Sequence, residues 1–322
     1  MKNILVIILI GLFGLHTFSQ TDKVEKELKK QSADTIEGWK AGGTFSINLA
    51  QVSFTNWSAG GQNSVSLNGL VNLFANYKKG NSNWENYLDI GYGTIKQGKN
   101  ADWWKTDDKI DFTSKYGQKA FSNWYYAGLI NFKTQMAEGY NYPDDSTLIS
   151  DLLAPGYLLG AIGLDYKKTD NFTAFIAPVT SKITIVKNQS LADAGAFGVE
   201  PAVIDSVTGN QVEPGKTIKV EFGGYIRLFY KKDLMENISL QTKLDLFSNY
   251  LENPQNIDVS WEVMIFMKIN KYISATISTH LLYDDDTDIW VDDNDNEIID
   301  NNEYRPRTQF KEVIGVGFSY KF

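Results

Sequence analysis

Alternation of apolar and polar side chains is the feature that most limits how this chain can fold. Successive side chains of a β-strand point to opposite faces, so a period of two marks a strand with one apolar and one polar side. In the final segment, one face carries Ile314, Val316, Phe318, Tyr320 and Phe322, and the other carries mostly polar or small residues. The pattern recurs in about twelve segments, at 43–56, 63–78, 84–97, 106–118, 122–137, 156–167, 171–186, 216–231, 236–251, 256–269, 272–284 and 307–322.

The connections between these segments alternate between short turns and longer loops. The longer ones, 138–155, 187–215 and 285–306, follow the fifth, seventh and eleventh segments, so all three lie on one side of an up-and-down sheet. This sorting is typical of outer-membrane barrels, whose tilted strands need roughly 9–11 residues to cross the bilayer. A soluble β-sandwich has no reason to sort its loops in this way. The sequence therefore predicts an all-β fold, a membrane-spanning antiparallel up-and-down β-barrel of about 12 strands.

The first part of the chain predicts export. Lys2 precedes an apolar run over 4–13, and small or polar residues follow it. This order indicates a cleavable signal peptide over 1–20, because the run is shorter than the roughly 20 residues of a spanning helix. Residues 21–36 are rich in charge and are expected to form a periplasmic N-terminal leader. Residues 37–322 are then the transmembrane β-barrel domain.

Composition narrows the function classes. The chain has no cysteine, which excludes disulfides, thiolate metal sites and cysteine nucleophiles. Its formal net charge of −8 argues against nucleic-acid binding, which needs a basic footprint. Aromatic residues near strand ends, such as Trp84, Tyr87, Trp124 and Tyr125, fit the headgroup level of a membrane. Lysines in the short turns, such as Lys167-Lys168, either face anionic lipid or simply solubilise the turns.

Four stretches resemble a Bacteroidota outer-membrane β-barrel family of unassigned function. They are Thr308 to Phe322, Asn56 to Asn63, Ala177 to Thr184 and Leu281 to Asp286, and they are scattered over most of the mature chain. The resemblance implies a barrel in the outer membrane of a Gram-negative bacterium, in contact with lipid and lipopolysaccharide. It implies no catalytic residues. The aromatic Phe322 also resembles the signal that the outer-membrane insertion machinery reads.

The acidic stretch 284–303 contains a candidate calcium site. Its oxygen-bearing side chains fall at the offsets of an EF-hand loop, namely Asp292, Asn294, Asn296, Asp300 and Glu303. Glu297 stands where such a loop needs glycine for its sharp turn, and strands rather than helices flank the stretch. A solvated acidic loop, or a contact with lipopolysaccharide bridged by divalent cations, explains the same residues. Calcium is the one cofactor that the sequence suggests.

Charges of both signs fall on the polar faces of the predicted strands. They are Glu85, Asp89, Lys219, Glu221, Arg227, Lys243, Asp245, Glu262, Lys268 and Lys311. Side chains fill an eight-stranded barrel, whereas large barrels enclose an aqueous channel, and twelve strands lie between these cases. Opposite charges in a narrow lumen tend to pair across it. The sequence predicts a lumen largely plugged by ion pairs, with room for a thin water path.

Two further positions carry structural or chemical predictions. His280 shares a strand face with Ser278 and is expected in the lumen, where the two side chains would point in parallel rather than form a catalytic pair. Pro178 interrupts a predicted strand and cannot donate a ladder hydrogen bond, so it indicates a bulge or a local break in pairing.

Three function classes follow from these observations. The favoured one is a structural or accessory subunit of an outer-membrane complex, with protein partners. The alternative is a narrow pore or transporter for small solutes. The third is an outer-membrane hydrolase. It has the least support, because only one histidine remains in the mature chain.

Overall fold

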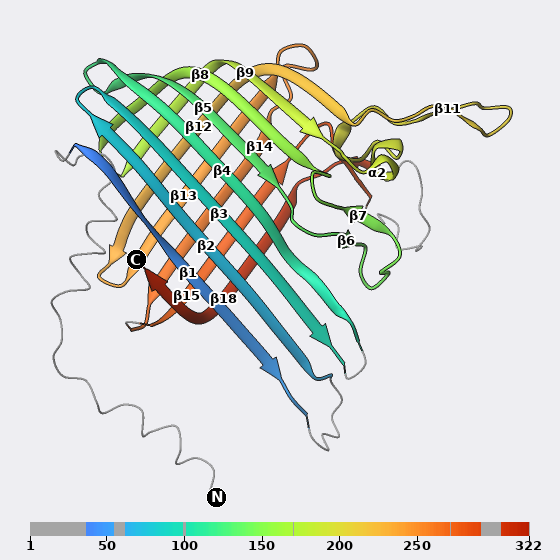
Figure 1. The fold of residues 1–322 in the computed structure, drawn as a ribbon, viewed down its shortest axis with the longest axis horizontal. Coiled ribbons are helices and arrows are strands. Elements are labelled where there is room, and N and C mark those ends of the chain that lie inside the picture. Colours follow the sequence, from blue (N-terminus) through green and yellow to red (C-terminus); the bar gives the residue numbers. More distant parts are fainter. Residues whose placement is uncertain are drawn as a thin grey trace, which may run out of the picture.

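A computed structural model describes residues 37–54, 62–98, 101–169, 171–270, 272–290 and 304–321. Twelve strands form a closed barrel in the order β1-β18-β15-β14-β13-β12-β9-β8-β5-β4-β3-β2 (Figure 1). Neighbours in this ring are antiparallel, which confirms the predicted fold class. The predicted signal peptide and leader, 1–20 and 21–36, lie outside the described residues.

The barrel strands agree closely with the alternating segments of the sequence. They are β1 (Gly38–Val52), β2 (Ser64–Lys79), β3 (Ser82–Gln97), β4 (Trp103–Phe121), β5 (Trp124–Thr134), β8 (Gly156–Thr169), β9 (Phe172–Ile185), β12 (Ile218–Met235), β13 (Ile238–Asn249), β14 (Asp258–Lys268), β15 (Ile273–Tyr283) and β18 (Gln309–Lys321). The largest difference is at β1, which is predicted at 43–56 but begins at Gly38. Its ladder with β2 starts there, opposite Lys78, whereas two glycines at 42 and 43 weaken the alternation in the sequence.

The predicted sorting of long loops is confirmed. The loop after β5 holds β6 (Gly139–Tyr140) and β7 (Leu148–Ser150), and the loop after β15 holds β16 (Asp288–Trp290) and β17 (Tyr304–Pro306). The loop after β9 holds α2 (Gln189–Asp193), the 3-10 turn η1 (Ala196–Gly198), β10 (Val203–Ile204) and β11 (Gln211–Glu213). Figure 1 shows β6, β7, α2 and β11 together at one end of the barrel. No helix of the described chain is long and apolar enough to cross a membrane.

The outer wall of the barrel is apolar. Outward side chains such as Ile47, Ile130, Ile162, Ile226 and Ile314 are well exposed. A surface of this kind is stable against lipid hydrocarbon, and barrel closure pairs the backbone groups that hydrocarbon cannot solvate. The wall therefore has the character of a membrane-spanning barrel.

Aromatic rings gather on the outer wall at the end that carries the short turns. Trp39 lies 5.2 Å from Tyr77 and 5.7 Å from Trp84, measured between ring centroids. Such rings suit the interface between hydrocarbon and headgroups. Tyr87 and Tyr125 are exceptions to the predicted belt. Their strand positions face the lumen, where the Tyr87 hydroxyl accepts a hydrogen bond from Asn76 and the Tyr125 ring lies under Lys167.

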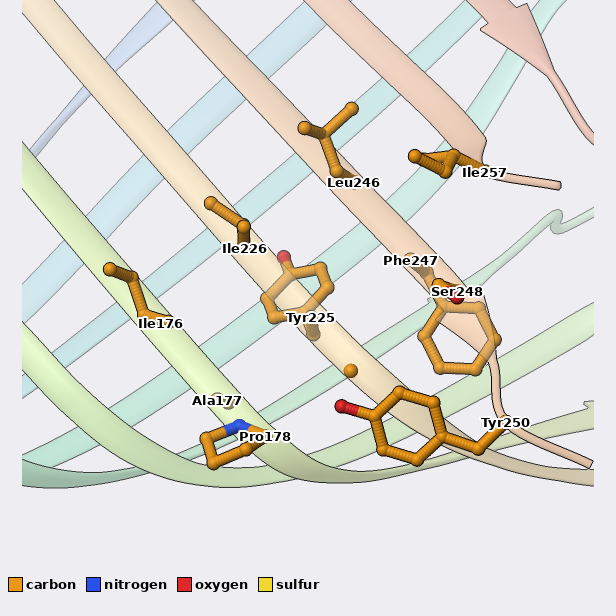
Figure 2. Close-up of a pocket in the computed structure, with 11 residues that line it drawn as sticks. Ile176, Ala177, Pro178, Tyr225, Ile226, Leu246, Phe247, Ser248, Tyr250 and Ile257 are labelled. Atoms are coloured by element: carbon orange, nitrogen blue, oxygen red, sulfur yellow. The ribbon is translucent and has the colours of Figure 1, made fainter. Parts of the chain in front are cut away.

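A bulge interrupts the wall at Pro178, as the sequence predicts. Ile162 of β8 lies opposite Val179, but Leu164 lies opposite Ile176, so β9 carries one extra residue between these pairs. The ladder between β9 and β12 shifts at the same place. Figure 2 shows the groove of about 290 Å³ beside the bulge, lined by Ile176, Pro178, Ile226, Leu246, Tyr250 and Ile257 among others. Its lining is mainly apolar, so lipid chains can fill it.

Gly163 is required beside this bulge. A Cβ atom at Gly163 would lie 2.0 Å from the carbonyl oxygen of Ile176 and 2.5 Å from Cα of Ala177. We expect Gly163→Ala to lower the free energy of unfolding by about 1–3 kcal/mol, because the added methyl group forces backbone apart. Gly160→Ala is the matched control on the same strand, since a Cβ at Gly160 meets nothing within 4 Å. Urea unfolding of both variants in lipid vesicles measures the difference, and equal stability of the two would contradict this account.

Candidate functional site

The lumen is the place where chemistry-bearing side chains gather. A turn-end cluster lies near the short turns and consists of Glu85 on β3, Lys115 on β4, and Asp165 and Lys167 on β8. Lys115 Nζ lies 2.8 Å from Asp165 Oδ2 and 3.3 Å from Glu85 Oε2. Lys167 Nζ lies 2.5 Å from Glu85 Oε1 and 3.2 Å from Asp165 Oδ2. Each lysine thus contacts both carboxylates, and the four charges balance.

A central cluster lies halfway along the barrel and crosses it. It consists of Lys109 and Asp111 on β4, Lys133 on β5, Lys243 on β13 and Glu262 on β14. Lys109 Nζ lies 3.4 Å from Glu262 Oε2, although β4 and β14 are six places apart in the ring of twelve. Lys243 Nζ lies 2.9 Å from Glu262 Oε1 and 3.5 Å from Asp111 Oδ2. These ion pairs join opposite walls of the lumen.

Two further polar contacts lie beside the central cluster. Arg227 binds Asp245 through two nitrogens, at 2.7 and 2.9 Å, along the wall between β12 and β13. Asn131 donates a hydrogen bond of 2.6 Å to Asp111. Bidentate and charge-assisted contacts of this kind are the strong ones among hydrogen bonds. Asn131 therefore helps to fix the Asp111 carboxylate, whereas Arg227 and Asp245 form a separate pair along the wall.

A loop-end cluster lies where the long loops begin. Lys182 of β9 is surrounded by three carboxylates, those of Asp258 at 2.7 Å, Asp284 at 3.3 Å and Glu221 at 3.4 Å. Asp258 belongs to β14, three places from β9 in the ring, so this cluster also spans part of the lumen. One ammonium group occupies the centre of the carboxylates and compensates part of their charge.

One sector of the lumen is mostly uncharged between these clusters. Neighbouring strands β15, β18 and β1 place small or neutral side chains inward, at Ser274, Thr276, Ser278, Gly315, Gly317, Ser46 and Asn48. Gly317 tolerates no side chain, because a Cβ there would lie 2.3 Å from the carbonyl oxygen of Ile47. The predicted ion pairs across the lumen are confirmed by the central cluster, whereas their role as a plug stays a prediction. The predicted water path stays a prediction, and this sector is the place for it.

His280 lies in the lumen, as the sequence predicts, and it contacts Ser260 of the neighbouring strand β14. His280 Nε2 is 2.9 Å from Ser260 Oγ. Glu262 lies opposite His280 in the ladder between β14 and β15, and its carboxylate is engaged by Lys243 and Lys109. A hydrolytic triad needs a third group that orients the histidine. The carboxylate opposite His280, that of Glu262, is instead paired with Lys243 and Lys109. The geometry fits a hydrogen-bonded polar pair in the wall.

The long loops form a small core of their own at the barrel end. Ala154, Val186, Leu191, Ala192 and Val199 are buried together and join the loop after β5 to the loop after β9. Beside them, the carboxylate of Asp193 accepts hydrogen bonds from the Gln189 side chain and the Gly215 backbone, both at 2.7 Å. These bonds lower the pKa of Asp193 below its usual value. The loop after β9 is thereby tied back onto its helix α2.

The predicted calcium ligands are not tested by the structure. Asp292, Asn294, Asn296, Asp300 and Glu303 all lie outside the described residues. Strands β16 and β17 pair with each other and bring the two ends of their stretch together. Within the described chain, no group of three or more histidine, cysteine or acidic residues is arranged to hold a metal ion. The calcium site therefore remains a prediction.

Sequence reasoning missed several members of the clusters. Lys109, Asp111 and Lys115 alternate on one face of a predicted strand, so their direction could have been found from the sequence. The sequence pattern places Lys167 in a short turn, whereas its side chain is 6% exposed and is buried in the turn-end cluster. The next residue, Lys168, is exposed on the opposite face, because successive side chains of a strand point to opposite sides.

The fold and this site define a closed β-barrel whose lumen is crossed by ion pairs. A family described as a protein of unknown function (DUF3078) matches residues 49–140, less than half of the chain. A search of curated proteins gave no match.

Among solved structures, the chain is similar to an outer membrane channel from Pseudomonas putida F1, at 9% identity and a TM-score of 0.39, with 90% of this chain and 97% of that chain covered. It is also similar to the outer membrane phospholipase A of Escherichia coli, at 11% identity and a TM-score of 0.34, with 88% and 98% covered. The translocator domain of the autotransporter NalP from Neisseria meningitidis is similar at 11% identity and a TM-score of 0.33, with 94% and 95% covered. These likenesses are too distant to bear on function.

Proposed function

We propose that this chain is an outer-membrane β-barrel of a Gram-negative bacterium and serves as a structural or accessory subunit of an outer-membrane complex. One observation carries the proposal, namely the pairs between Lys109 and Glu262 and between Lys243 and Asp111, which join opposite walls. A pore for solutes needs an aqueous path that these side chains obstruct. The apolar outer wall and the aromatic belt support the location.

The alternative function is a narrow pore that uses the uncharged sector of β15, β18 and β1. Apart from His280 and Lys311, which also face the lumen from β15 and β18, its inward side chains named above are small and neutral, so they offer neither strong binding nor strong repulsion to an ion. Currents through such a path would be small, since the central cluster occupies the adjoining part of the lumen. The two functions therefore differ in the current that the barrel conducts across a lipid bilayer.

We expect the purified wild-type barrel to give no large, stable current steps in planar lipid bilayers, because the central cluster bars the lumen. Affinity isolation from native outer membranes is expected to recover protein partners in fixed ratio. Large stable currents from a barrel that recovers no partner would overturn the proposal in favour of the pore.

A further inference from the structure

The barrel closes through an unusually short seam. In the described residues, β1 and β18 share five residue pairs, from Thr44 opposite Lys321 to Asn48 opposite Gly317. Every other pair of neighbouring barrel strands shares ten or more, as β14 does with β15. The seam therefore holds the ring together over only part of its height.

The two strands separate beyond Asn48 and Gly317. β1 continues to Val52 along its other neighbour, β2, and β18 begins at Gln309 along β15. Figure 1 shows the end of β1 and the beginning of β18 apart from each other. No strand of the described chain pairs with the β1 side of β18 over residues 309–316.

This free edge lies at membrane depth. β15 has eleven residues, about the number that a tilted strand needs to cross the bilayer, and β18 pairs with it over ten of them. The outward side chains of Ile314 and Val316 are 66% and 57% exposed, as expected for contact with hydrocarbon. An unpaired sheet edge in hydrocarbon leaves backbone groups without partners, each at a cost of several kcal/mol.

We propose that the free edge of β18 is a docking site for an extended β-strand of a partner protein in the outer membrane. Only a peptide backbone offers donors and acceptors at strand spacing, so a lipid chain cannot replace it. The proposal rests on the proposed accessory function and specifies where the partner binds. The partner strand places apolar side chains outward beside Ile314 and Val316, and small side chains inward beside Gly315.

Disulfide trapping tests whether the edge is free for a partner, because the chain has no native cysteine. Ile47→Cys with Phe318→Cys joins positions that are opposite each other in the seam, and it should form an intramolecular disulfide readily in native membranes. Leu49→Cys with Val316→Cys continues the same register by two residues and faces the same side. This second pair is expected to remain at least roughly tenfold slower to cross-link, since its strands are apart.

Photo-cross-linking in the same membranes identifies the occupant. A benzoylphenylalanine in place of Val316 is expected to capture a polypeptide whose attached segment alternates apolar and small residues. The same probe at Ile277, an outward position on β15 beside Ile314, is the matched control and should capture nothing. Slower cross-linking at Leu49 and Val316 together with such an alternating segment supports the proposal.

Three results would overturn the docking site. The first is fast intramolecular cross-linking of both cysteine pairs, which means that the seam closes on itself. The second is a covalent dimer through Leu49→Cys and Val316→Cys, which means that a second copy of this chain is the occupant. The third is equal capture from positions 316 and 277. If partners still co-purify in any of these cases, the docking site fails while the proposed function stands.

Discussion

Asp165→Asn is expected to lower the free energy of unfolding of the barrel by about 3–5 kcal/mol, the usual cost of breaking a buried ion pair from one side. The Asp165 side chain is 1% exposed and contacts both Lys115 and Lys167. Its neutralisation leaves Glu85 as the only carboxylate of the turn-end cluster to balance two ammonium groups. Urea unfolding in lipid vesicles, followed by tryptophan fluorescence, measures the loss.

Asp107→Asn is the matched control for this prediction. Asp107 also lies on a barrel strand and pairs with a lysine, Lys311, but the two side chains are 29% and 47% exposed. Pairs of this kind typically contribute less than about 1 kcal/mol. Adding Lys167→Met to Asp165→Asn restores charge balance and should recover part of the stability. Equal losses of unfolding free energy at Asp165 and Asp107, or no recovery of stability in the double variant, would contradict the view that burial makes the Asp165 ion pairs costly to break.

The strands were predictable because each one is governed by a local rule. A membrane barrel needs an apolar outer face on every strand, and as a result apolar and polar residues alternate along each strand of the sequence. The rule fails where side chains are missing. At β1 the glycines at 42 and 43 hide the alternation, and only the ladder with β2 shows that the strand begins at Gly38.

The ion-pair partners were not predictable from the same rule. Alternation tells that Lys109 and Glu262 point inward, but it does not tell how far apart their strands lie around the ring or how their heights compare. Those quantities depend on strand order and register, which place β4 opposite β14. The pair of Ser260 with His280 was missed for the same reason, because the two residues come from adjacent strands and lie diagonally, two residues away from the directly opposite pair of Glu262 and His280.

The largest functional effect is expected from emptying the central cluster. The variant with Ala at Lys109, Asp111, Lys243 and Glu262 removes two positive and two negative charges, so the net charge is unchanged. It also removes the side chains that join β4 to β13 and β14. We expect single-channel conductance in planar bilayers to rise by on the order of tenfold or more, because a twelve-stranded ring without these side chains has room for water. The uncharged sector of β15, β18 and β1 then adjoins the opened space.

Arg227→Ala with Asp245→Ala separates this effect from a general loosening of the barrel. The pair is also buried, charge-balanced and inward, but it links neighbouring strands β12 and β13 along the wall and does not cross the lumen. Its removal should reduce stability while conductance stays near the wild-type level. If both variants conduct equally, the ion pairs of the central cluster are not what closes the lumen, and leakage through a weakened wall explains the current. If neither conducts, the loop core around Val186 and Leu191 is the remaining barrier, and its removal becomes the next variant to measure.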